Sequence, residues 1–548
     1  MKTWAVVLVA IASAVCTLLS SAPFGLGIGA IGAPYFLILL VLFAPSTHLA
    51  VRIVFIFQIP LWLWLHSWVE GVSVAGWIAL AVYMSIWAPL FVLILRKTLT
   101  WNRVTLVVQA PVLWVGLECL RGIVLFDGYP WYLAGTGILD WPIVSIASVG
   151  SVWAASFLVV VIASSLAIYK QVRWWTWSCI GIVCTIFLFL GIDSEKHLGP
   201  RMDVAVIQTN VPQSNKVAWS WEEQRKDVSE AIRMTLESTL TGKVNPSLII
   251  WPETMLPGSG FEVHQEDYAP WEELFTPHWI WAQKILEVAS EIETPILVGS
   301  QTLTEIEITE DNQVLHLENS TRFNSSVLVR PNGETERYDK IFLTPFGETI
   351  PYVDKVPFLR NWFRDNFGAA MLFNLEVGET PKRFSVQGEG FAKNSVEFIN
   401  IATPICFEDT VPFVVRRLVF ENGERRAGFL INLSNDGWFG NNNSARLQHI
   451  REARMRCVEN MTPMIRAANT GLSCLIDSKG RVRKIAEYEG EAALMKSAIM
   501  HARVFEGVKL PLSRFIGDWV AWLSLIGGIL LVIGSWKKRS NENDKTSN

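Results

Sequence analysis

The sequence predicts a helical membrane protein with about eight spans that also carries a large α/β or α+β domain outside the bilayer. Three observations support this fold class: the composition, the uneven placement of charges, and a long region in which short strands alternate with helices. Of the 548 residues, 51% are hydrophobic and only 18% are charged, and 25 are tryptophan. This profile is too apolar for an ordinary soluble protein. The formal net charge of −4 gives no electrostatic reason to expect nucleic-acid binding.

Long apolar segments account for the predicted membrane domain. Between Lys2 and Arg52 the chain has no charged residue if histidine is counted as neutral, which leaves room for two helices broken near residues 20–25. Further apolar segments cover residues 53–69, 71–95, 104–126, 141–169, 174–192 and 516–536. Each is near or above the roughly 18–20 residues that a spanning helix needs, and 53–69 is the shortest. The predicted organisation is therefore seven spans, a domain, an eighth span and a polar tail, in residues 1–192, 193–514, 515–536 and 537–548.

The placement of lysine and arginine predicts which side the domain occupies. If the spans alternate, most cations fall on one side of the membrane: Lys2, Arg52, Arg96, Lys97, Arg103, Lys170, Arg173 and residues 537–539. The opposite connections hold Glu70, Asp127 and Asp140, with Arg121 as the discordant cation. Because cytoplasmic loops are enriched in Lys and Arg, residues 193–514 are expected outside the cytoplasm. The first apolar segment could instead be a cleaved signal peptide, but it has one lysine before it and another apolar segment directly after it.

The region after the seventh span reads as a layered α/β or α+β domain. Short strands are expected at "MDVAVIQTNVPQ", "SLIIWPE", "PILVGS", "VEFINIATPIC", "GFLINLSND" and "PMIRAANTGLSCLIDSKGRV". Helices are expected over residues 221–241, 279–292 and 444–459, and a hairpin turns at Asn332–Gly333. Strands that alternate with helices indicate a layered domain, although the order of the strands cannot be read from this pattern.

Three residues of this domain, Glu253, Lys340 and Cys406, each stand where an extended segment ends. Strand ends are where α/β folds assemble functional sites. Cysteine is a strong nucleophile as the thiolate, which a nearby cation favours. A glutamate could take the thiol proton and later return it, and a lysine could stabilise an oxyanion. Each residue alone is weak support, because a single Glu or Lys in a loop is usually a solvated surface residue.

Cys406 in "TPICFED" could be a packing residue, half of a disulfide, a metal ligand or a nucleophile. Two carboxylates follow it directly, which is unusual for a residue of a bland apolar core. The predicted outer domain has three cysteines, Cys406, Cys457 and Cys474. An odd number in an oxidising compartment leaves at least one unpaired within the chain, and a Cys457–Cys474 bridge is one alternative. The eight histidines show no ligand-like spacing, so no metal is expected.

The order Glu, Lys, Cys and the flanking motifs resemble the nitrilase superfamily, whose fold is an α-β-β-α sandwich. The motifs are "WPET" around Glu253, "YDKIFLTPFGE" around Lys340 and "PICFED" around Cys406. The spans on both sides of the domain, together with "QTNVPQ", "NDGWFG", "QHIREARMRCVEN" and "RAANTG", look like the apolipoprotein N-acyltransferase family of bacteria. This resemblance covers essentially the whole chain. The sequence departs from the family pattern at Phe407, where Tyr is usual, and at "YDK", where "YNK" is usual.

The resemblance implies an activity and a role for each motif residue. Members of that family transfer an acyl chain from a membrane phospholipid to the α-amino group of the N-terminal S-diacylglyceryl cysteine of an apolipoprotein. They work in the bacterial inner membrane, with the catalytic domain on the extracytoplasmic side. By this resemblance Cys406 attacks the ester and carries the acyl group as a thioester, with Glu253 as general base and acid and Lys340 as oxyanion donor. Glu348 and Glu408 are implied to support the site by orienting Lys340 and Glu253.

The expected partners are a phospholipid donor, a diacylglyceryl-modified apolipoprotein acceptor and membrane lipids, with no cofactor and a monomeric chain. Trp219 matches loosely a tryptophan that follows "NVPQ" in the family, and Phe407 adjoins the nucleophile, so both are candidate substrate contacts. The segment 358–373 mixes aromatic and aliphatic residues with two arginines. That composition suits an element at the level of the lipid headgroups, with Trp362 and Phe363 as contacts, or equally an amphipathic surface helix.

Two asparagines near these motifs, Asn324 and Asn435, are expected to hold loops rather than to take part in the chemistry. Two other functions are also compatible with parts of the sequence. A membrane-tethered hydrolase acting on a soluble amide could use the same three residues, although one span would then suffice as an anchor. A non-enzymatic scaffold that only binds lipoproteins would not need Glu, Lys and Cys together. A covalent acyl adduct would separate the transferase from both.

Overall fold

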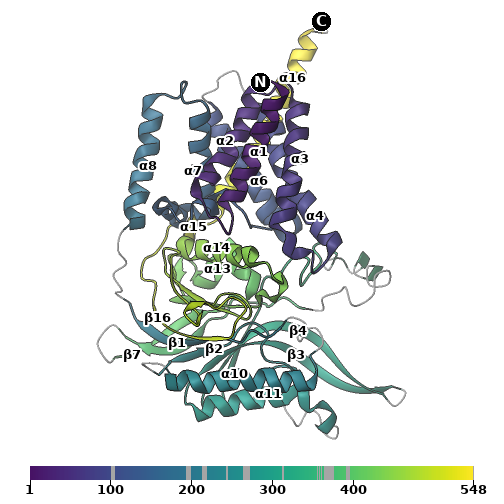
Figure 1. Ribbon diagram of the computed structural model, residues 1–548, viewed down its shortest axis with the longest axis vertical. Coiled ribbons are helices and arrows are strands. Elements are labelled where there is room, and N and C mark those ends of the chain that lie inside the picture. Colours follow the sequence, from purple (N-terminus) through teal and green to yellow (C-terminus); the bar gives the residue numbers. More distant parts are fainter. Residues whose placement is uncertain are drawn as a thin grey trace. The chain divides into compact units, whose positions relative to one another are not determined.

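The structure is a computed structural model in which the chain forms two units, a helical unit and a sheet unit (Figure 1). The helical unit comprises Met1–Glu195, Phe439–Glu459 and Pro511–Asn548, and the sheet unit comprises Lys196–Trp438 and Asn460–Leu510. The structure describes residues 1–99, 105–192, 199–212, 219–241, 245–262, 272–311, 314–353, 356, 358–359, 361–362, 375–390 and 395–546.

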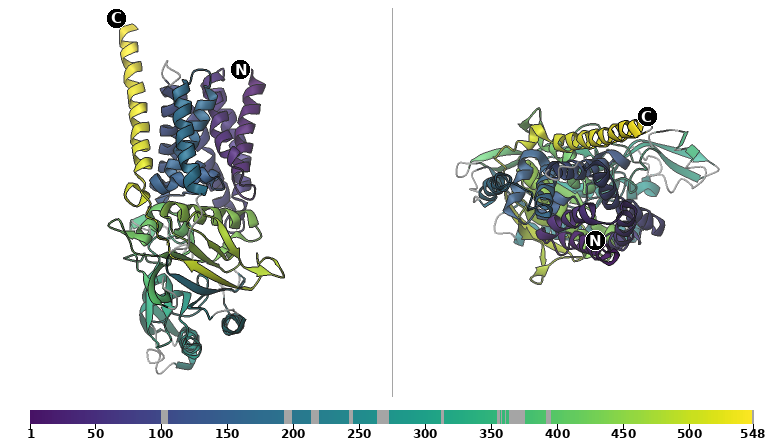
Figure 2. Two further views of the ribbon diagram at one scale, coloured as in Figure 1. Left: turned by 90° about the vertical axis from the view of Figure 1, so that its left-hand side faces the viewer. Right: turned by 90° about the horizontal axis from the view of Figure 1, so that it is seen from above.

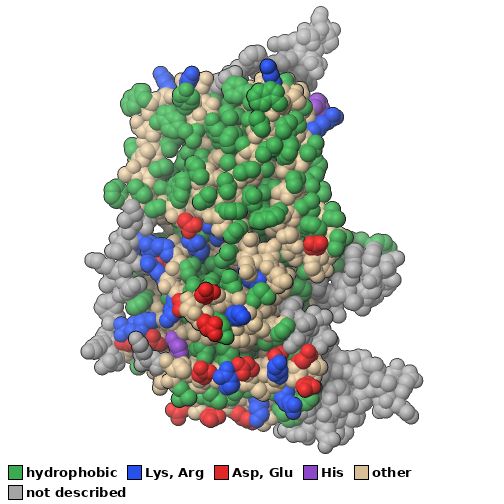
Figure 3. All heavy atoms as spheres, viewed as in Figure 1, with side chains coloured by type: hydrophobic (Ala, Val, Ile, Leu, Met, Phe, Trp, Pro, Cys, Tyr) green, Lys and Arg blue, Asp and Glu red, His purple; other side chains and the backbone are tan. Residues whose placement is uncertain are grey.

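The helical unit contains the predicted spans. Its longer helices are α1 (Thr3–Ser20), α2 (Gly27–Phe43), α3 (Thr47–Leu65), α4 (Val74–Ser85), α5 (Trp87–Thr98), α6 (Leu106–Cys119), α7 (Ala147–Ala167), α8 (Trp174–Ile192) and α16 (Trp519–Thr546). Among the described residues, six helical segments are long and apolar enough to cross a membrane: Thr3–Ser20, Thr47–Leu65, Val74–Thr98, Leu106–Asp127, Pro142–Ala167 and Trp519–Trp536. Two shorter apolar helices, Gly27–Phe43 and Thr176–Leu190, lie where the other two spans are expected. Apolar side chains cover the visible face of this unit (Figure 3).

The last long helix, α16, lies very close to the backbone of α6. α16 packs along α6, and the two run side by side in the helical unit (Figure 2). A Cβ added at Gly116 of α6 would lie 2.9 Å from the carbonyl oxygen of Ser524 on α16. Small residues at such contacts let membrane helices approach closely, where packing rather than the hydrophobic effect drives association.

Helix α14 (Asn443–Asn460) packs with the helical unit, although the sequence places it inside the outer domain. The side chain of Gln448 accepts a hydrogen bond from the backbone N–H of Ala22 at 2.9 Å. Glu452 accepts one from Tyr132 N–H at 3.1 Å, and Glu459 accepts one from Val152 N–H at 2.7 Å. These polar residues satisfy backbone donors of the helical unit, which explains why an apparently solvated helix face is buried.

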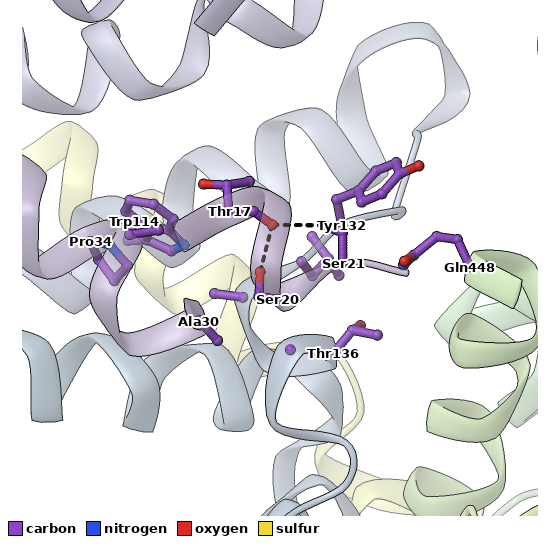
Figure 4. A pocket seen from close by; sticks show the side chains of 13 residues that line it. Thr17, Ser20, Ser21, Ala30, Pro34, Trp114, Tyr132, Thr136 and Gln448 are labelled. Carbon is purple, nitrogen blue, oxygen red and sulfur yellow. Dashed lines mark hydrogen bonds between the residues drawn. The ribbon is translucent and has the colours of Figure 1, made fainter. Parts of the chain in front are cut away.

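A small cavity in the helical unit lies beside Gln448 (Figure 4). Hydroxyl side chains of Thr17, Ser20, Ser21 and Thr136 contribute to its lining, together with the rings of Trp114 and Tyr132. The hydroxyl groups of Ser20 and Ser21 both donate to the backbone carbonyl of Thr17, each at 2.9 Å. The polar groups of this wall are therefore engaged with the protein itself.

The sheet unit is built on a sheet of 12 strands, of which eleven follow the order β13-β12-β11-β10-β7-β6-β1-β2-β3-β4-β5 and the twelfth, β16, pairs with β1. β1 and β6 pair at one position, Arg201 with Glu389, so six strands lie on each side of this link. The strands are β1 (Arg201–Gln208), β2 (Leu248–Ile250), β3 (Ile296–Asp311), β4 (Val314–Val329), β5 (Thr335–Asp339), β6 (Phe384–Glu389), β7 (Val396–Ala402), β10 (Phe429–Ser434), β11 (Met464–Ala468), β12 (Cys474–Ile476), β13 (Val482–Ile485) and β16 (Ala498–Phe505).

Helices α10 (Trp221–Thr241) and α11 (Glu272–Glu291) cover one face of the β1–β4 half. Their apolar residues, such as Val228 and Ile285, share one buried cluster with Ile249 and Val298 of the sheet. The predicted fold class, a helical membrane region with an α/β sheet domain, is thereby confirmed. The sequence analysis missed two strands, β6 and β16. β6 pairs with β7, the next strand along the chain, whereas β16 pairs with β1, which is far away along the chain. Residues 301–322 form the outer part of the β3–β4 hairpin, which is paired as far as Asp311 and Val314.

Candidate active site

Cys406 lies at the start of a short 3₁₀ turn, η9 (Cys406–Thr410), that follows β7. Its backbone is in the left-handed region with a φ of 50°, which is strained for a residue with a side chain. The side chain of Asn432 on β10 fixes this turn by donating to the carbonyl oxygens of Pro404 at 3.1 Å and Cys406 at 3.2 Å. Strain of this kind persists only where the surroundings enforce it, and it is concentrated at functional sites.

Glu253 follows β2 and is 6% exposed. Its Oε1 atom accepts a hydrogen bond from the side-chain amide of Asn324 at 2.8 Å. Its Oε2 atom accepts one from the backbone N–H of Asn435, also at 2.8 Å. The loop can sit this close to β3 because of Gly299, where an added Cβ would lie 2.5 Å from the Cα of Glu253. The carboxylate is therefore held from both sides.

Lys340 directly follows β5 and is buried, with 1% of its surface exposed. Its ammonium donates to Glu348 Oε2 at 2.5 Å and, more weakly, to Thr344 Oγ1 at 3.4 Å. Burial alone would lower the pKa of Lys340, but the charge of Glu348, reinforced by that of Glu253, raises this pKa above its ordinary value. The side chain is therefore an ammonium with three protons, of which two have acceptors among the described residues. The third is available to an oxygen atom of a substrate.

Asn324 joins the glutamates on the two sides of the site. The same Nδ2 atom that donates to Glu253 also donates to Glu348 Oε1 at 2.9 Å. Burial favours the neutral form of Glu348, but Lys340 outweighs it and lowers the pKa of Glu348 below its usual value. Glu348 thus remains a carboxylate that orients Lys340, as the resemblance implies. The sequence analysis missed the positioning role of Asn324, because a bridge between two glutamates depends on tertiary structure.

The charges of Glu253 and Lys340 both affect the pKa of the Cys406 thiol. Burial raises the pKa of Cys406 well above its usual range; the Glu253 carboxylate raises it further, and the Lys340 ammonium opposes this. The resting thiol is therefore protonated at neutral pH. Because only the thiolate is strongly nucleophilic, the site needs a base at the moment of attack. The charge of Glu253 acts on the thiol directly, which makes Glu253 the candidate for accepting that proton.

Glu408 braces the backbone on both sides of the site. Its carboxylate accepts hydrogen bonds from four donors: Tyr338 Oη, Ile341 N–H, Phe342 N–H and Ile405 N–H, at 2.8–3.0 Å. Burial raises the pKa of Glu408 to about 7, although Lys340 and these donors favour its charged form. The carboxylate ties the segment after Lys340 to the residue before Cys406. Its bonds go to these donors rather than to Glu253, so the expectation that it orients Glu253 is not met by direct contact.

Three of the four candidate substrate contacts are among the described residues, and their surroundings differ. Phe407 is buried and stacks on Phe342, with ring centroids 6.3 Å apart. Trp219 donates its indole N–H to Asp227 at 3.0 Å and packs against the α10–α11 core. Trp362 is 49% exposed. Phe363 lies outside the described residues, as does most of the segment 358–373.

Two other expectations can be compared with the structure. Cys457 and Cys474 form no disulfide with each other. Asn435 holds its loop, as expected, through an amide that accepts a hydrogen bond from Asn469 at 2.9 Å. Its backbone N–H also binds Glu253, a role that residue type alone could not have indicated.

Comparison with known proteins agrees with this geometry. The family model described as carbon-nitrogen hydrolase matches residues 203–502, which is more than half of the chain. The chain belongs to the carbon–nitrogen hydrolase family. This family domain contains Glu253, Lys340 and Cys406, together with every residue that contacts them above. Outside it, the model described as the apolipoprotein N-acyltransferase N-terminal domain matches residues 13–165.

The relatives of this chain include bacterial proteins that it matches over most of their length. The chain is 27% identical to an apolipoprotein N-acyltransferase of Geobacter metallireducens, over 86% of this chain and 82% of the relative. It is 28% identical to an apolipoprotein N-acyltransferase of Aquifex aeolicus, over 71% of this chain and 75% of the relative. Among solved structures, Saccharomyces cerevisiae Nit3 of the nitrilase superfamily aligns with 14% identity and a TM-score of 0.33, over 57% of this chain and 93% of that chain.

Glu253 is expected to affect Cys406 in two opposite ways: its charge raises the pKa of the thiol, and its carboxylate accepts the thiol proton during attack. The variant Glu253→Gln separates these two effects. In Glu253→Gln the charge that raises the Cys406 pKa is lost, so this pKa should fall and the thiolate should become more populated. Acylation of Cys406 should nevertheless slow by about 10²–10⁴-fold, because the proton acceptor is gone. The pKa is measured from the pH dependence of iodoacetamide labelling, quantified on the peptide that contains Cys406.

Glu334→Gln, at an exposed position in the β4–β5 turn, is the matched control and should change neither quantity. A Cys406 pKa that stays unchanged or rises in Glu253→Gln would show that the carboxylate does not act on the thiol.

Proposed function

We propose that this protein transfers an acyl chain from a membrane phospholipid to the α-amino group of the N-terminal S-diacylglyceryl cysteine of apolipoproteins. The observation that carries the proposal is the set formed by partly buried Cys406 and buried Glu253 and Lys340 within a carbon–nitrogen hydrolase domain. The apolar helices before that domain match an apolipoprotein N-acyltransferase N-terminal domain, which favours a lipid substrate. The relatives that share both regions carry the same enzyme name.

The first half-reaction forms a thioester. Glu253 takes the proton from the Cys406 thiol as the sulfur attacks the ester carbonyl of the phospholipid. The oxyanion of the tetrahedral intermediate accepts a hydrogen bond from the remaining N–H of the Lys340 ammonium. Glu348 holds this ammonium in place. When the intermediate collapses, the carbon–oxygen bond to the lipid breaks, and Glu253 returns the proton to the leaving alkoxide. A lysophospholipid departs, and the acyl group stays on Cys406.

The second half-reaction uses the same groups in reverse. The neutral α-amino group of the acceptor attacks the thioester carbonyl, and Lys340 again stabilises the oxyanion. Glu253 accepts the proton that the amine must lose, and Cys406 leaves as a thiolate that this proton then neutralises. Dividing the transfer into two steps lets one lipid leave before the other enters, so the three reacting groups need not be aligned at once.

A hydrolase acting on a soluble amide is the alternative that the same residues allow. Large apolar side chains that are exposed on the described part of the domain favour a lipid instead. Phe346, two residues before Glu348, is 61% exposed, and Phe358 is 72% exposed. Exposed apolar residues of this size commonly mark interaction with another protein or with a membrane. A soluble amide would not require the eight apolar helices either.

We further propose that the chain works as a monomer in the bacterial cytoplasmic membrane, with residues 193–514 outside the cytoplasm and the tail 537–548 inside. The alternating distribution of Lys and Arg supports this orientation. The donor and acceptor then meet Cys406 at the outer face of the bilayer.

The orientation is tested with topology reporters. A reporter fused after Lys538 should behave as cytoplasmic, and one inserted near Glu310, in the β3–β4 hairpin, should behave as extracytoplasmic. Activities of alkaline phosphatase and green fluorescent protein fusions report the two sides. Finding both positions on one side would mean that the number of spans is wrong by one.

The activity is tested with purified protein, a phospholipid and a synthetic diacylglyceryl-cysteine peptide. N-acylated peptide should form with the wild type, and Cys406→Ala should reduce its formation by about 10⁴-fold or more. Cys406→Ser should also lose turnover, since Glu253 would face a far less acidic hydroxyl. Cys457→Ala, which removes another buried thiol, should retain the wild-type rate. Normal product formation by Cys406→Ala would exclude the proposed mechanism.

A further inference from the structure

A fully buried arginine, Arg466 on β11, lies at the centre of a network behind the catalytic residues. Its Nη1 atom donates to Asp409 Oδ2 at 2.7 Å and to Asn432 Oδ1 at 2.9 Å. Its Nη2 atom donates to Asp436 Oδ1 at 2.8 Å and to Ser434 Oγ at 3.1 Å. One guanidinium therefore contacts two different carboxylates on two different segments.

The partners on the Nη1 side belong to the Cys406 turn. Asp409 is in the same 3₁₀ turn as Cys406. Asn432 uses its oxygen to accept from Arg466 and its amide N–H to hold the Cys406 carbonyl. The guanidinium of Arg466 is thus linked to the strained Cys406 turn in two ways, by an ion pair with Asp409 and by a hydrogen bond to the side-chain amide of Asn432.

The partners of Nη2, Asp436 and Ser434, flank Asn435, the loop residue that binds Glu253. Asp436 directly follows Asn435, whose backbone N–H binds Glu253. Ser434 also donates to Asp436 Oδ1 at 2.9 Å. Gly471 closes the other side of Asp436: an added Cβ there would lie 2.0 Å from Asp436 Oδ2. The aspartate is confined to one position, and with it the donor to Glu253.

Stability alone does not account for such an arrangement. Buried ion pairs often contribute little net stability, because desolvation of the charges offsets their attraction. What a planar guanidinium adds is a fixed spacing between two acceptors, which a single ammonium cannot reproduce. Rates of reaction within an active site are sensitive to displacements of about 1 Å, which can cost about 100-fold.

We propose that Arg466 is a positioning residue that keeps the Cys406 turn in register with the loop that holds Glu253. Through Asp409 and Asn432 it fixes the nucleophile, and through Asp436 it fixes the donor that orients the base. This inference rests on the proposed function, because the reaction to be measured is the acylation of Cys406 by phospholipid.

Two variants perturb the network in different ways. Arg466→Lys keeps the positive charge but cannot contact Asp409 and Asp436 together. Gly471→Ala leaves every charge in place and displaces Asp436 sterically. Arg503→Lys is the control, because Arg503 also binds a carboxylate through two nitrogens, that of Asp203, on a partly exposed edge away from the network.

Acyl-enzyme formation is followed in single turnovers at several phospholipid concentrations, with thermal unfolding measured in parallel. Both variants should lower the maximal acylation rate by about 10–100-fold without changing the half-saturating lipid concentration. Combined, they should be less than additive, since they disturb one contact. Arg503→Lys should match the wild type.

Folded variants that acylate at the wild-type rate, even with lowered unfolding temperatures, would show a structural role only and overturn the inference. If Arg466→Lys fails to fold, the maximal rate of Gly471→Ala decides. A wild-type protein that forms no acyl-enzyme would instead refute the proposed function, so the two failures are distinguishable.

Discussion

The structure around Cys406 depends on burying several carboxylates beside one thiol and one ammonium. Glu253, Glu348 and Glu408 are all buried or nearly so, and an unpaired charge there would be costly. Each is stabilised differently: Glu348 by Lys340, Glu408 by backbone and phenol donors, and Glu253 by one side-chain and one backbone amide. The thiol carries no charge at rest, which limits the electrostatic cost of the assembly. It becomes charged only when a substrate brings a carbonyl that can accept the electrons.

The division of labour among the carboxylates follows from these contacts. A glutamate bonded to an ammonium cannot serve as a base at neutral pH, so Glu348 is restricted to orienting Lys340. Glu408 accepts from four donors, the Tyr338 hydroxyl and three backbone N–H groups. Glu253 is the carboxylate whose charge acts most directly on Cys406 among the three. In the proposed mechanism the proton therefore has one acceptor, Glu253, which serves in both half-reactions.

The sequence predicts those features of the fold and the site that depend on residues close together along the chain. Glu253, Lys340 and Cys406 could be singled out because each ends a strand, and the spans because their composition is local to each helix. Contacts between distant segments were not accessible. β16 pairs with β1 from Arg201–Phe505 onward, some 300 residues away along the chain. Glu452 and Glu459 make α14 look like a solvated helix until their backbone partners are known. The bridging amide of Asn324 and the two-sided guanidinium of Arg466 likewise have no signature in residue spacing.

The central claim is that Cys406 carries the acyl group between donor and acceptor. The most direct measurement is peptide mass spectrometry of wild-type protein incubated with phospholipid in the absence of acceptor. The account predicts one added acyl mass on the peptide that contains Cys406, removed by hydroxylamine and by a diacylglyceryl-cysteine peptide. An acyl group on a different residue, or efficient transfer with no acyl group on Cys406 at any time, would contradict it.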